Sequence, residues 1–143
     1  MRALGIDLGS RRVGVALSDG AGTLAVPYEV VVRSGDRARD RARIAELVDE
    51  VGAEVVVDGL PRSLDGSAGP AELAARAEVD ALRAELPVPV ETWDERLTTV
   101  TAHRELAAAG VRSRGRRAVV DKVAASVMLQ SWLDHRRATE EDA

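Results

Sequence analysis

Alternation between apolar and polar positions divides the first part of the chain into three predicted β-strands. Residues 3–8 and 12–18 are apolar runs on either side of a short turn, residues 9–11, and this arrangement is typical of a β-hairpin. A third run, residues 23–32, is rich in β-branched side chains. It contains Pro27, which favours a sheet edge or a β-bulge because proline has no backbone N–H to donate. We therefore expect three antiparallel strands.

Helices and strands alternate in the rest of the chain. The predicted elements are a helix between Asp36 and Gly52, a strand over residues 55–57, a helix over 71–86, a strand over 88–93, and helices over 98–109 and 118–135. The charged face of the first helix is expected to be solvated. Residues 111–117 form an arginine-rich loop, and the acidic tail, residues 139–143, is expected to be disordered. Antiparallel strands followed by strands joined through helices predict a mixed α/β sheet with helices on its faces, in a single domain over residues 1–138.

The composition is that of one globular domain. With 143 residues the chain can enclose a core, and with 2% aromatic residues and no Phe this core must consist of Val, Leu and Ala. The lack of cysteine excludes disulfides and thiolate metal sites and suits a reducing, cytoplasmic location. We expect neither a membrane span nor a signal peptide, because the apolar runs are short and Asp7 interrupts the first. The net charge of -4 means that a polyanion would have to bind a local basic patch.

Four carboxylates fall near strand ends and helix starts, where α/β sheets place their sites. Asp7 is near the end of the first strand, Asp94 and Glu95 end the last strand, and Asp121 heads the apolar stripe of the last helix. Acids that converge without His or Cys suit Mg²⁺ or Mn²⁺, and two such ions can drive an in-line phosphodiester displacement. Taken singly, Asp7 could instead be satisfied by backbone amides, and Asp121 could simply favour a helix N-terminus.

Basic side chains stand close to these acids in the sequence. They are Arg11, Arg12, Arg96, Arg112, Arg114, Arg116, Arg117 and Lys122. The clustering could reflect the high arginine content of the chain, or it could mark contacts to backbone phosphates. Because aromatic residues are scarce, we expect recognition of phosphates and shape, sensitive to salt, rather than base stacking. Gly5, Gly9 and Gly14 could let a phosphate or a sugar approach the hairpin backbone.

Four blocks of this sequence resemble the YqgF (RuvX) family of pre-16S rRNA nucleases and Holliday junction resolvase-like proteins. In order, they are residues 5–9 with 14–19, residues 59–61 with 65–67, residues 94–99, and residues 121–125 with 129–133. The resemblance spans about residues 3–134, nearly the whole chain. It implies an RNase H-like fold, with a mixed five-stranded sheet of three antiparallel strands and then two parallel ones, and helices on both faces. It also implies that Asp7, Glu95 and Asp121 are metal-binding catalytic acids, with Asp94 as a further candidate ligand.

The same resemblance implies a cytoplasmic nuclease that processes the 5′ end of pre-16S rRNA with Mg²⁺ or Mn²⁺, in a site for two ions. Branched DNA, such as a Holliday junction, is the alternative substrate, and cutting its two symmetric strands would require a two-fold dimer, for which the sequence identifies no surface. Asp58, just before the second block, is either an extra ligand or a polar group at a sheet edge. Two other functions stay open: an ATPase or sugar kinase, whose first phosphate loop the hairpin resembles, and a non-catalytic RNA- or protein-binding module in rRNA maturation or transcription.

Overall fold

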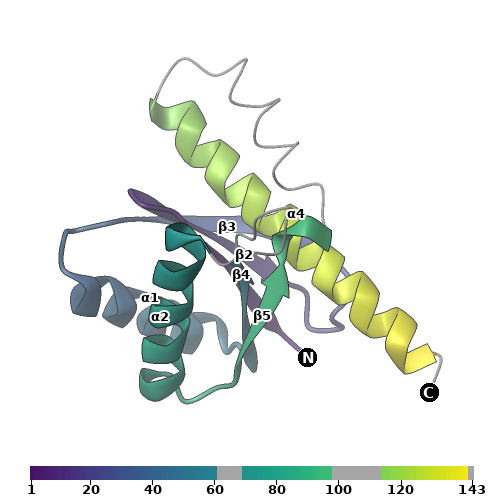
Figure 1. Ribbon diagram of the computed structural model, residues 1–143. Helices are drawn as coiled ribbons and strands as arrows, with labels where there is room; N and C mark the ends of the chain where they lie inside the picture. The colour runs from purple at the N-terminus through teal and green to yellow at the C-terminus, as the bar shows by residue number, and fades with distance from the viewer. Residues whose placement is uncertain (61–68, 98–113, 142–143) are drawn as a thin grey trace.

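A single mixed sheet forms the centre of the molecule (Figure 1). The computed structural model describes residues 1–60, 69–97 and 114–141, and of residues 114–119 and 141 it describes only the helical backbone. The strands are β1 (Ala3–Leu8), β2 (Arg12–Ser18), β3 (Ala25–Val32), β4 (Val55–Leu60) and β5 (Val90–Asp94), in the spatial order β3-β2-β1-β4-β5. The pairs β1–β2 and β2–β3 are antiparallel, and β1–β4 and β4–β5 are parallel. The predicted sheet is confirmed.

Helices cover both faces of this sheet, as predicted (Figure 1). The helices α1 (Arg37–Val51) and α2 (Pro70–Glu85) pack on one face, α4 (Arg114–Glu141) packs on the other, and a short 3₁₀ turn, η1 (Glu95–Leu97), follows β5. The side chain of Asp36 accepts hydrogen bonds from two backbone N–H groups at the start of α1, and Gly52, with φ 66°, ends this helix in the left-handed conformation. The helix predicted over residues 98–109 lies outside the described residues. No helix in the described ranges is long and apolar enough to cross a bilayer.

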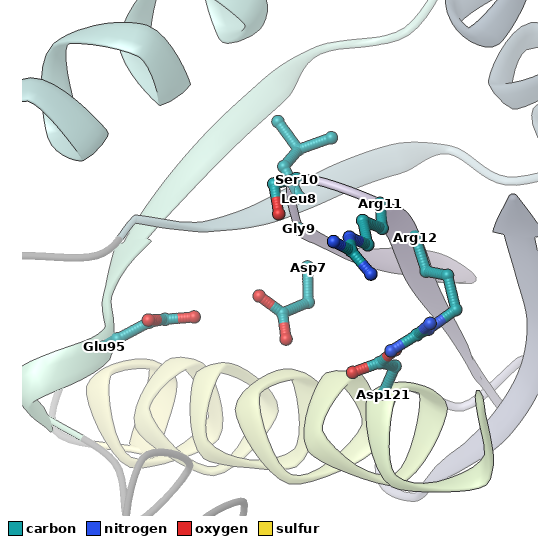
Figure 2. Close-up of a pocket in the computed structure, with 8 residues that line it drawn as sticks. All are labelled: Asp7, Leu8, Gly9, Ser10, Arg11, Arg12, Glu95 and Asp121. Atoms are coloured by element: carbon teal, nitrogen blue, oxygen red, sulfur yellow. The ribbon is translucent and has the colours of Figure 1, made fainter. Parts of the chain in front are cut away.

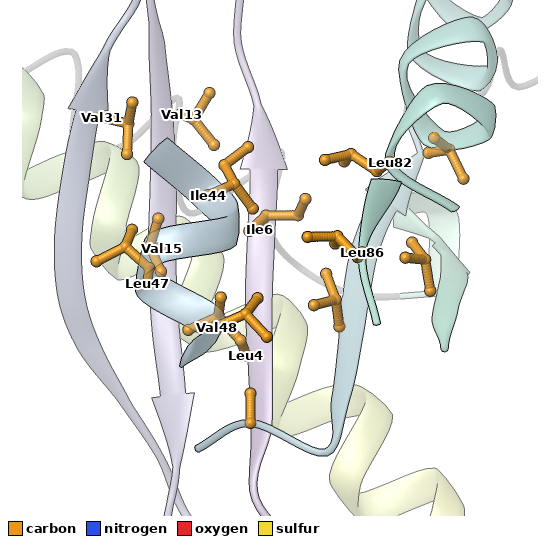
Figure 3. Close-up of a cluster of buried hydrophobic side chains, with 14 of the residues drawn as sticks. Leu4, Ile6, Val13, Val15, Val31, Ile44, Leu47, Val48, Leu82 and Leu86 are labelled. Carbon is orange, nitrogen blue, oxygen red and sulfur yellow. The ribbon is translucent and has the colours of Figure 1, made fainter. Parts of the chain in front are cut away.

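Alternation along the strands separates two hydrophobic cores. Leu4 and Ile6 of β1 face α1 and α2, where they meet side chains such as Ile44 and Leu82 (Figure 3). The second core lies under α4 and contains Ala3, Val57, Trp93, Ala125, Met128 and Leu129. Because Ile6 faces α1 and α2, its neighbour Asp7 faces α4.

Two glycines let α4 lie close to the sheet. A Cβ on Gly5 would lie 2.9 Å from Cβ of Leu129, and a Cβ on Gly14 would overlap the backbone oxygen of Asp121. At Gly9 the nearest atom to such a Cβ is the carbonyl oxygen of Arg12 in the same turn, 2.5 Å away. The expectation that these glycines leave room for a phosphate or a sugar is therefore wrong for Gly5 and Gly14, because α4 fills that room.

Several element boundaries differ from the predicted ones. The strand β4 continues through Asp58 to Leu60, and α4 starts at Arg114, inside the predicted loop. The helix α4 also continues to Glu141, so the expected disorder is wrong for residues 139–141. Arginine and glutamate are good helix formers, and Arg136 pairs with Glu140 one turn later, at 3.1 Å. The last helix is therefore longer at both ends than its apolar stripe indicated.

The strand β3 has both features that its proline favoured. It lies at one edge of the sheet, and its register against β2 shifts between Val15 and Ala16, where Pro27 is the partner of Ala16. An edge position and a bulge both remove the need for a proline N–H in the sheet.

Candidate functional site

Three of the predicted acids surround one cavity of about 250 Å³ (Figure 2). Asp7 comes from the end of β1, Glu95 from η1 and Asp121 from α4. The other lining residues form the β1–β2 turn and its edges: Leu8, Gly9, Ser10, Arg11 and Arg12. The fold thus brings together three predicted acids and two predicted phosphate-binding arginines from segments far apart in the sequence.

Two glycines on the sheet leave room for these acids. Asp7 is paired across the strands with Gly14, so no side chain stands beside it on β2, and the backbone of Asp121 occupies that space instead. A Cβ on Gly59 would lie 3.2 Å from Oε1 of Glu95. Gly14 and Gly59 therefore clear the α4 face of the sheet at the positions next to the acids.

The acids differ in burial and in partners. Asp7 and Glu95 are each 8% exposed, whereas the side chain of Asp121 is 22% exposed. Nε of Arg12 donates a hydrogen bond to Oδ2 of Asp121 at 2.5 Å, and this is a charge-assisted contact. Asp121 lies about two turns into α4, so a preference for the helix N-terminus does not explain its position.

The chemistry of the cavity fits a hard cation. Among its lining residues, the charged side chains that can act as metal ligands are carboxylates, with no His or Cys. Mg²⁺ and Mn²⁺ prefer such oxygen ligands. As they stand, no three His, Cys, Asp or Glu side chains within the described ranges lie close enough together to hold one ion. Binding of one ion by all three acids would therefore require the carboxylates to move toward one another, and Asp121 would have to exchange Arg12 for the ion.

Asp94 and Arg96 lie outside the lining of this cavity. Asp94 is paired in the sheet with Leu60, whose side chain packs in the α1 and α2 core. The carboxylate of Asp94 accepts hydrogen bonds from the backbone N–H of Arg96 at 2.9 Å and from its guanidinium at 2.8 Å. The hydrogen bond from its guanidinium to Asp94 raises the pKa of Arg96. Burial opposes this rise, and the negative charges of Asp94 and Glu72 add to it.

Asp58 does not lie at a sheet edge, because β4 lies between β1 and β5. It is in register with Ile6 and is fully buried on the α1 and α2 face, away from the cavity lining. Neither of its oxygens has a hydrogen-bond partner in the structure. Burial raises the pKa of Asp58 well above its usual value, and the negative charges of Asp7, Glu78 and Glu95 raise it further. Burial without a hydrogen-bond partner therefore favours the protonated form of this carboxyl group.

The predicted basic cluster is described only in part. Arg112 lies outside the described residues, and Arg114, Arg116 and Arg117 belong to the first turn of α4, where only the backbone is described. Lys122 follows Asp121 on α4, is half-buried and does not line the cavity. Contact of these residues with phosphate stays a prediction.

Contacts behind the β1–β2 turn, which no sequence pattern indicated, support it. Nε of Arg33 donates to the carbonyl of Gly9 at 3.0 Å, and its backbone N–H donates to the carbonyl of Arg11 at 2.8 Å. The two terminal nitrogens of Arg33 bind the two carboxylate oxygens of Glu78 on α2, at 2.8 and 2.9 Å. The side chain of Arg33 is only 8% exposed. This ion pair ties the wall of the cavity to the helix layer on the opposite face, and no local pattern links residues so far apart.

Related sequences cover nearly the whole chain. A protein from Mycobacterium sp. (strain KMS), named "Putative pre-16S rRNA nuclease", is 54% identical over 138 residues, which are 96% of this chain and 82% of that protein. A protein of the same name from Desulforudis audaxviator (strain MP104C) is 46% identical over 96% of this chain and 97% of its own length.

Solved structures share the architecture at low sequence identity. Thermus thermophilus RuvC in complex with a Holliday junction substrate matches with a TM-score of 0.62 and 19% identity, over 97% of each chain. The large terminase nuclease of the thermophilic phage G20c matches with a TM-score of 0.50 and 15% identity, over 88% of this chain and 80% of that one. These matches confirm the RNase H-like fold.

The family is decided by a family-wide sequence model. The model named RuvX, and described as Holliday junction resolvase, matches residues 1–135. The two relatives above have 54% and 46% sequence identity to this protein over 96% of its chain. Together with them, this match shows that the chain belongs to the RuvX family.

Proposed function

We propose that this protein is a metal-dependent nuclease that hydrolyses phosphodiester bonds in structured RNA, and that it processes the 5′ end of pre-16S rRNA. The observation that carries the proposal is the convergence of Asp7, Glu95 and Asp121 on one cavity from three distant segments. The relatives named for pre-16S rRNA point to the substrate.

The three acids would contribute to metal binding in different ways, because they differ in burial. Asp7, Glu95 and Asp121 would hold one or two Mg²⁺ or Mn²⁺ ions, which supply an activated water and stabilise the leaving oxygen when bound. Asp7 and Glu95 are nearly shielded from water, so their charges act through a medium of low dielectric constant and attract cations more strongly than surface carboxylates do. Asp121 is the most exposed of the three acids, so it would lie on the side from which a substrate approaches the ions.

Cations beside the cavity would bind the RNA backbone. Arg11 is exposed in the turn that lines the cavity, and Arg12 follows it. The protein carries a net charge of -4, so attraction of a polyanion depends on this local patch and falls steeply with salt. We expect recognition of RNA shape and phosphates rather than of stacked bases, because the chain has few aromatic residues.

Asp7→Asn tests the proposal, since it removes the charge and keeps the size of the side chain. We expect Mn²⁺-dependent cleavage of a precursor rRNA fragment to fall by at least about a hundredfold. The circular dichroism spectrum should stay that of the native protein. Asp49→Asn, at an exposed carboxylate of α1, serves as the matched control and should cleave normally. Undiminished cleavage by Asp7→Asn would overturn the proposal.

A four-way DNA junction is the second substrate to test, because the family model is described as Holliday junction resolvase. The same assay with a junction in place of rRNA distinguishes the two substrates. Cleavage of the junction alone would favour resolution of branched DNA. Tight RNA binding that survives EDTA, without cleavage of either substrate, would instead favour a non-catalytic binding module.

A further inference from the structure

We propose that Arg12 exchanges between two partners: the carboxylate of Asp121 in the metal-free protein, and a phosphate of the nucleic acid once the acids hold a metal ion. Metal and nucleic acid would then strengthen each other's binding through one side chain. This inference rests on the proposed function, which it extends by naming the residue that couples the two ligands.

The first partner of Arg12 is visible in the structure. Its Nε lies 2.5 Å from Oδ2 of Asp121, and the two side chains are 26% and 22% exposed. A guanidinium and a metal ion compete for the same carboxylate oxygen, because both need its lone pairs at close range. An ion that recruits Asp121 must therefore displace Arg12, and Arg12 lowers the metal affinity of the cavity as long as it stays in place.

Arg12 differs from the other paired arginines near the site. Arg33 is bound to Glu78, and Arg96 is bound to Asp94, and neither carboxylate lines the cavity. A metal ion in the cavity would leave those two pairs intact. Among the ion pairs of the described ranges, the pair of Arg12 and Asp121 joins two residues of the cavity lining.

The surrounding main chain restricts the exchange to the side chains. The backbone of Asp121 is packed against Gly14, and the carbonyl of Arg12 accepts a hydrogen bond from the N–H of Gly9 at 3.0 Å. Arg33 holds the carbonyl of Arg11 as well. Because both backbones are fixed, rotation of the long Arg12 side chain is enough to release Asp121.

Once released, Arg12 would be a cation at the rim of a cavity that holds the scissile region of the substrate. Arg11 is exposed beside it, so two guanidinium groups would face the phosphates together. By thermodynamic linkage, the factor by which metal strengthens nucleic-acid binding equals the factor by which nucleic acid strengthens metal binding. Removing Arg12 should reduce both factors.

The first experiment measures Mn²⁺ binding by calorimetry, without nucleic acid and at constant ionic strength. Arg12→Gln should bind Mn²⁺ about fivefold more tightly than the wild-type protein, because a partly exposed ion pair no longer competes. Arg11→Gln is the matched control for the loss of one positive charge, and it should change the affinity by less than about twofold.

The second experiment measures binding of a labelled precursor rRNA fragment by fluorescence anisotropy over a range of salt concentrations. In Ca²⁺, the slope of log Kd against log salt should exceed that in EDTA by about 0.7–0.9 for the wild-type protein, which corresponds to one additional phosphate contact. Arg11→Gln should keep this difference, and Arg12→Gln should lose it. Arg12→Lys keeps the positive charge but lacks the Nε–H group that binds Asp121. It should therefore keep the difference between the salt slopes in Ca²⁺ and in EDTA, and it should bind Mn²⁺ more tightly than the wild type. This variant replaces Arg12→Gln if Arg12→Gln does not fold.

The outcomes separate this inference from the function on which it rests. A wild-type protein that binds no Mn²⁺ would overturn the proposed function and the exchange together. If the wild-type protein binds Mn²⁺ and Arg12→Gln behaves like Arg11→Gln, or binds the ion more weakly than the wild type, the exchange is wrong and the nuclease proposal stands.

Discussion

Asp58 and Asp40 show how differently the fold treats two buried carboxyl groups. Asp58 is completely buried without a hydrogen-bond partner, and its pKa is raised, chiefly by burial. Asp40 is 3% exposed, although its helix face was predicted to be solvated. Burial also acts to raise its pKa, but hydrogen bonds from the backbone and hydroxyl of Ser34, together with nearby arginines, lower it below the usual value. Burial therefore favours the protonated form of Asp58, whereas the partners of Asp40 favour its ionised form.

Asp58→Asn should change how stability depends on pH. Below the pKa of the unfolded chain, about 3.9, Asp58 is protonated in both states and contributes no pH dependence. Above that value the unfolded chain ionises first, so the wild type loses stability as pH rises toward the raised pKa of the folded state. The variant lacks this loss. Its free energy of unfolding in urea, relative to the wild type, should therefore increase between about pH 5 and pH 8.

Asp49→Asn is the control for this measurement, because Asp49 is exposed on α1. Its difference from the wild type should stay flat over the same pH range. A difference between Asp58→Asn and the wild type that does not vary with pH would show that Asp58 is not held in its neutral form.

At the scale of elements, the β1–β2 turn owes its position to the layer behind the sheet. Arg33, at the end of β3, contacts the carbonyl groups of Gly9 and Arg11 and pairs with Glu78 of α2. Arg37 also donates to Glu78, at 2.5 Å. Two helices and a strand thus hold the turn that carries Arg11 and Arg12 into the cavity.

Arg33→Ala should destabilise the protein by about 2 kcal/mol, because it leaves a largely buried carboxylate with a weaker set of partners. Arg43→Ala removes an exposed arginine from its i,i+3 pair with Glu46 and should cost less than about 1 kcal/mol. Urea unfolding of both variants checks the difference. Equal effects of the two substitutions would show that the Arg33 pair is no stronger than a surface pair.

Local signals predicted the elements better than their ends and contacts. The turn after Leu8, the edge position of Pro27 and the end of α1 at Gly52 each follow from one residue's conformational preference. The extension of β4 through Asp58 and Gly59 could not be predicted, since both residue types disfavour strands and pairing with β1 and β5 decides the matter.

The candidate site was predictable in its acids but not in their surroundings. The motif positions of Asp7, Glu95 and Asp121 identified the residues that line the cavity. The pairing of Arg12 with Asp121 joins residues 109 positions apart, and it depends on how α4 crosses β2. Such contacts are products of tertiary packing, which no short stretch of sequence encodes.

At the scale of the whole molecule, the sheet separates the side covered by α1 and α2 from the side covered by α4, on which the candidate site lies (Figure 1). The core under α1 and α2 holds most of the large aliphatic side chains, whereas the cavity lies on the side of α4. The C-terminal half of α4 then closes the second core with Met128, Trp132 and Leu133. Stability and the proposed function would therefore both depend on the last helix, but on different parts of it.

Two truncations should separate these parts. Removal of residues 139–143 should change the free energy of unfolding by less than about 0.5 kcal/mol, because Thr139 and Glu140 are exposed. Removal of residues 132–143 takes away Trp132 and Leu133, which are 7% and 1% exposed, and should abolish cooperative thermal unfolding. Thermal unfolding of both truncated proteins is measured by circular dichroism. Cooperative transitions with the same midpoint temperature in both would contradict this division of α4.

The contact between Gly14 and the carbonyl oxygen of Asp121 acts as a mechanical stop. If α4 moved along the sheet by one residue, other backbone atoms would face the space at Gly14 of β2. A side chain at position 14 would instead push the helix away from the sheet. The separation between Asp7 and Asp121 is therefore set by main chain against main chain, across the pair that Asp7 forms with Gly14. Substitutions of the side chains in the β1–β2 turn should consequently leave the spacing of these two acids unchanged.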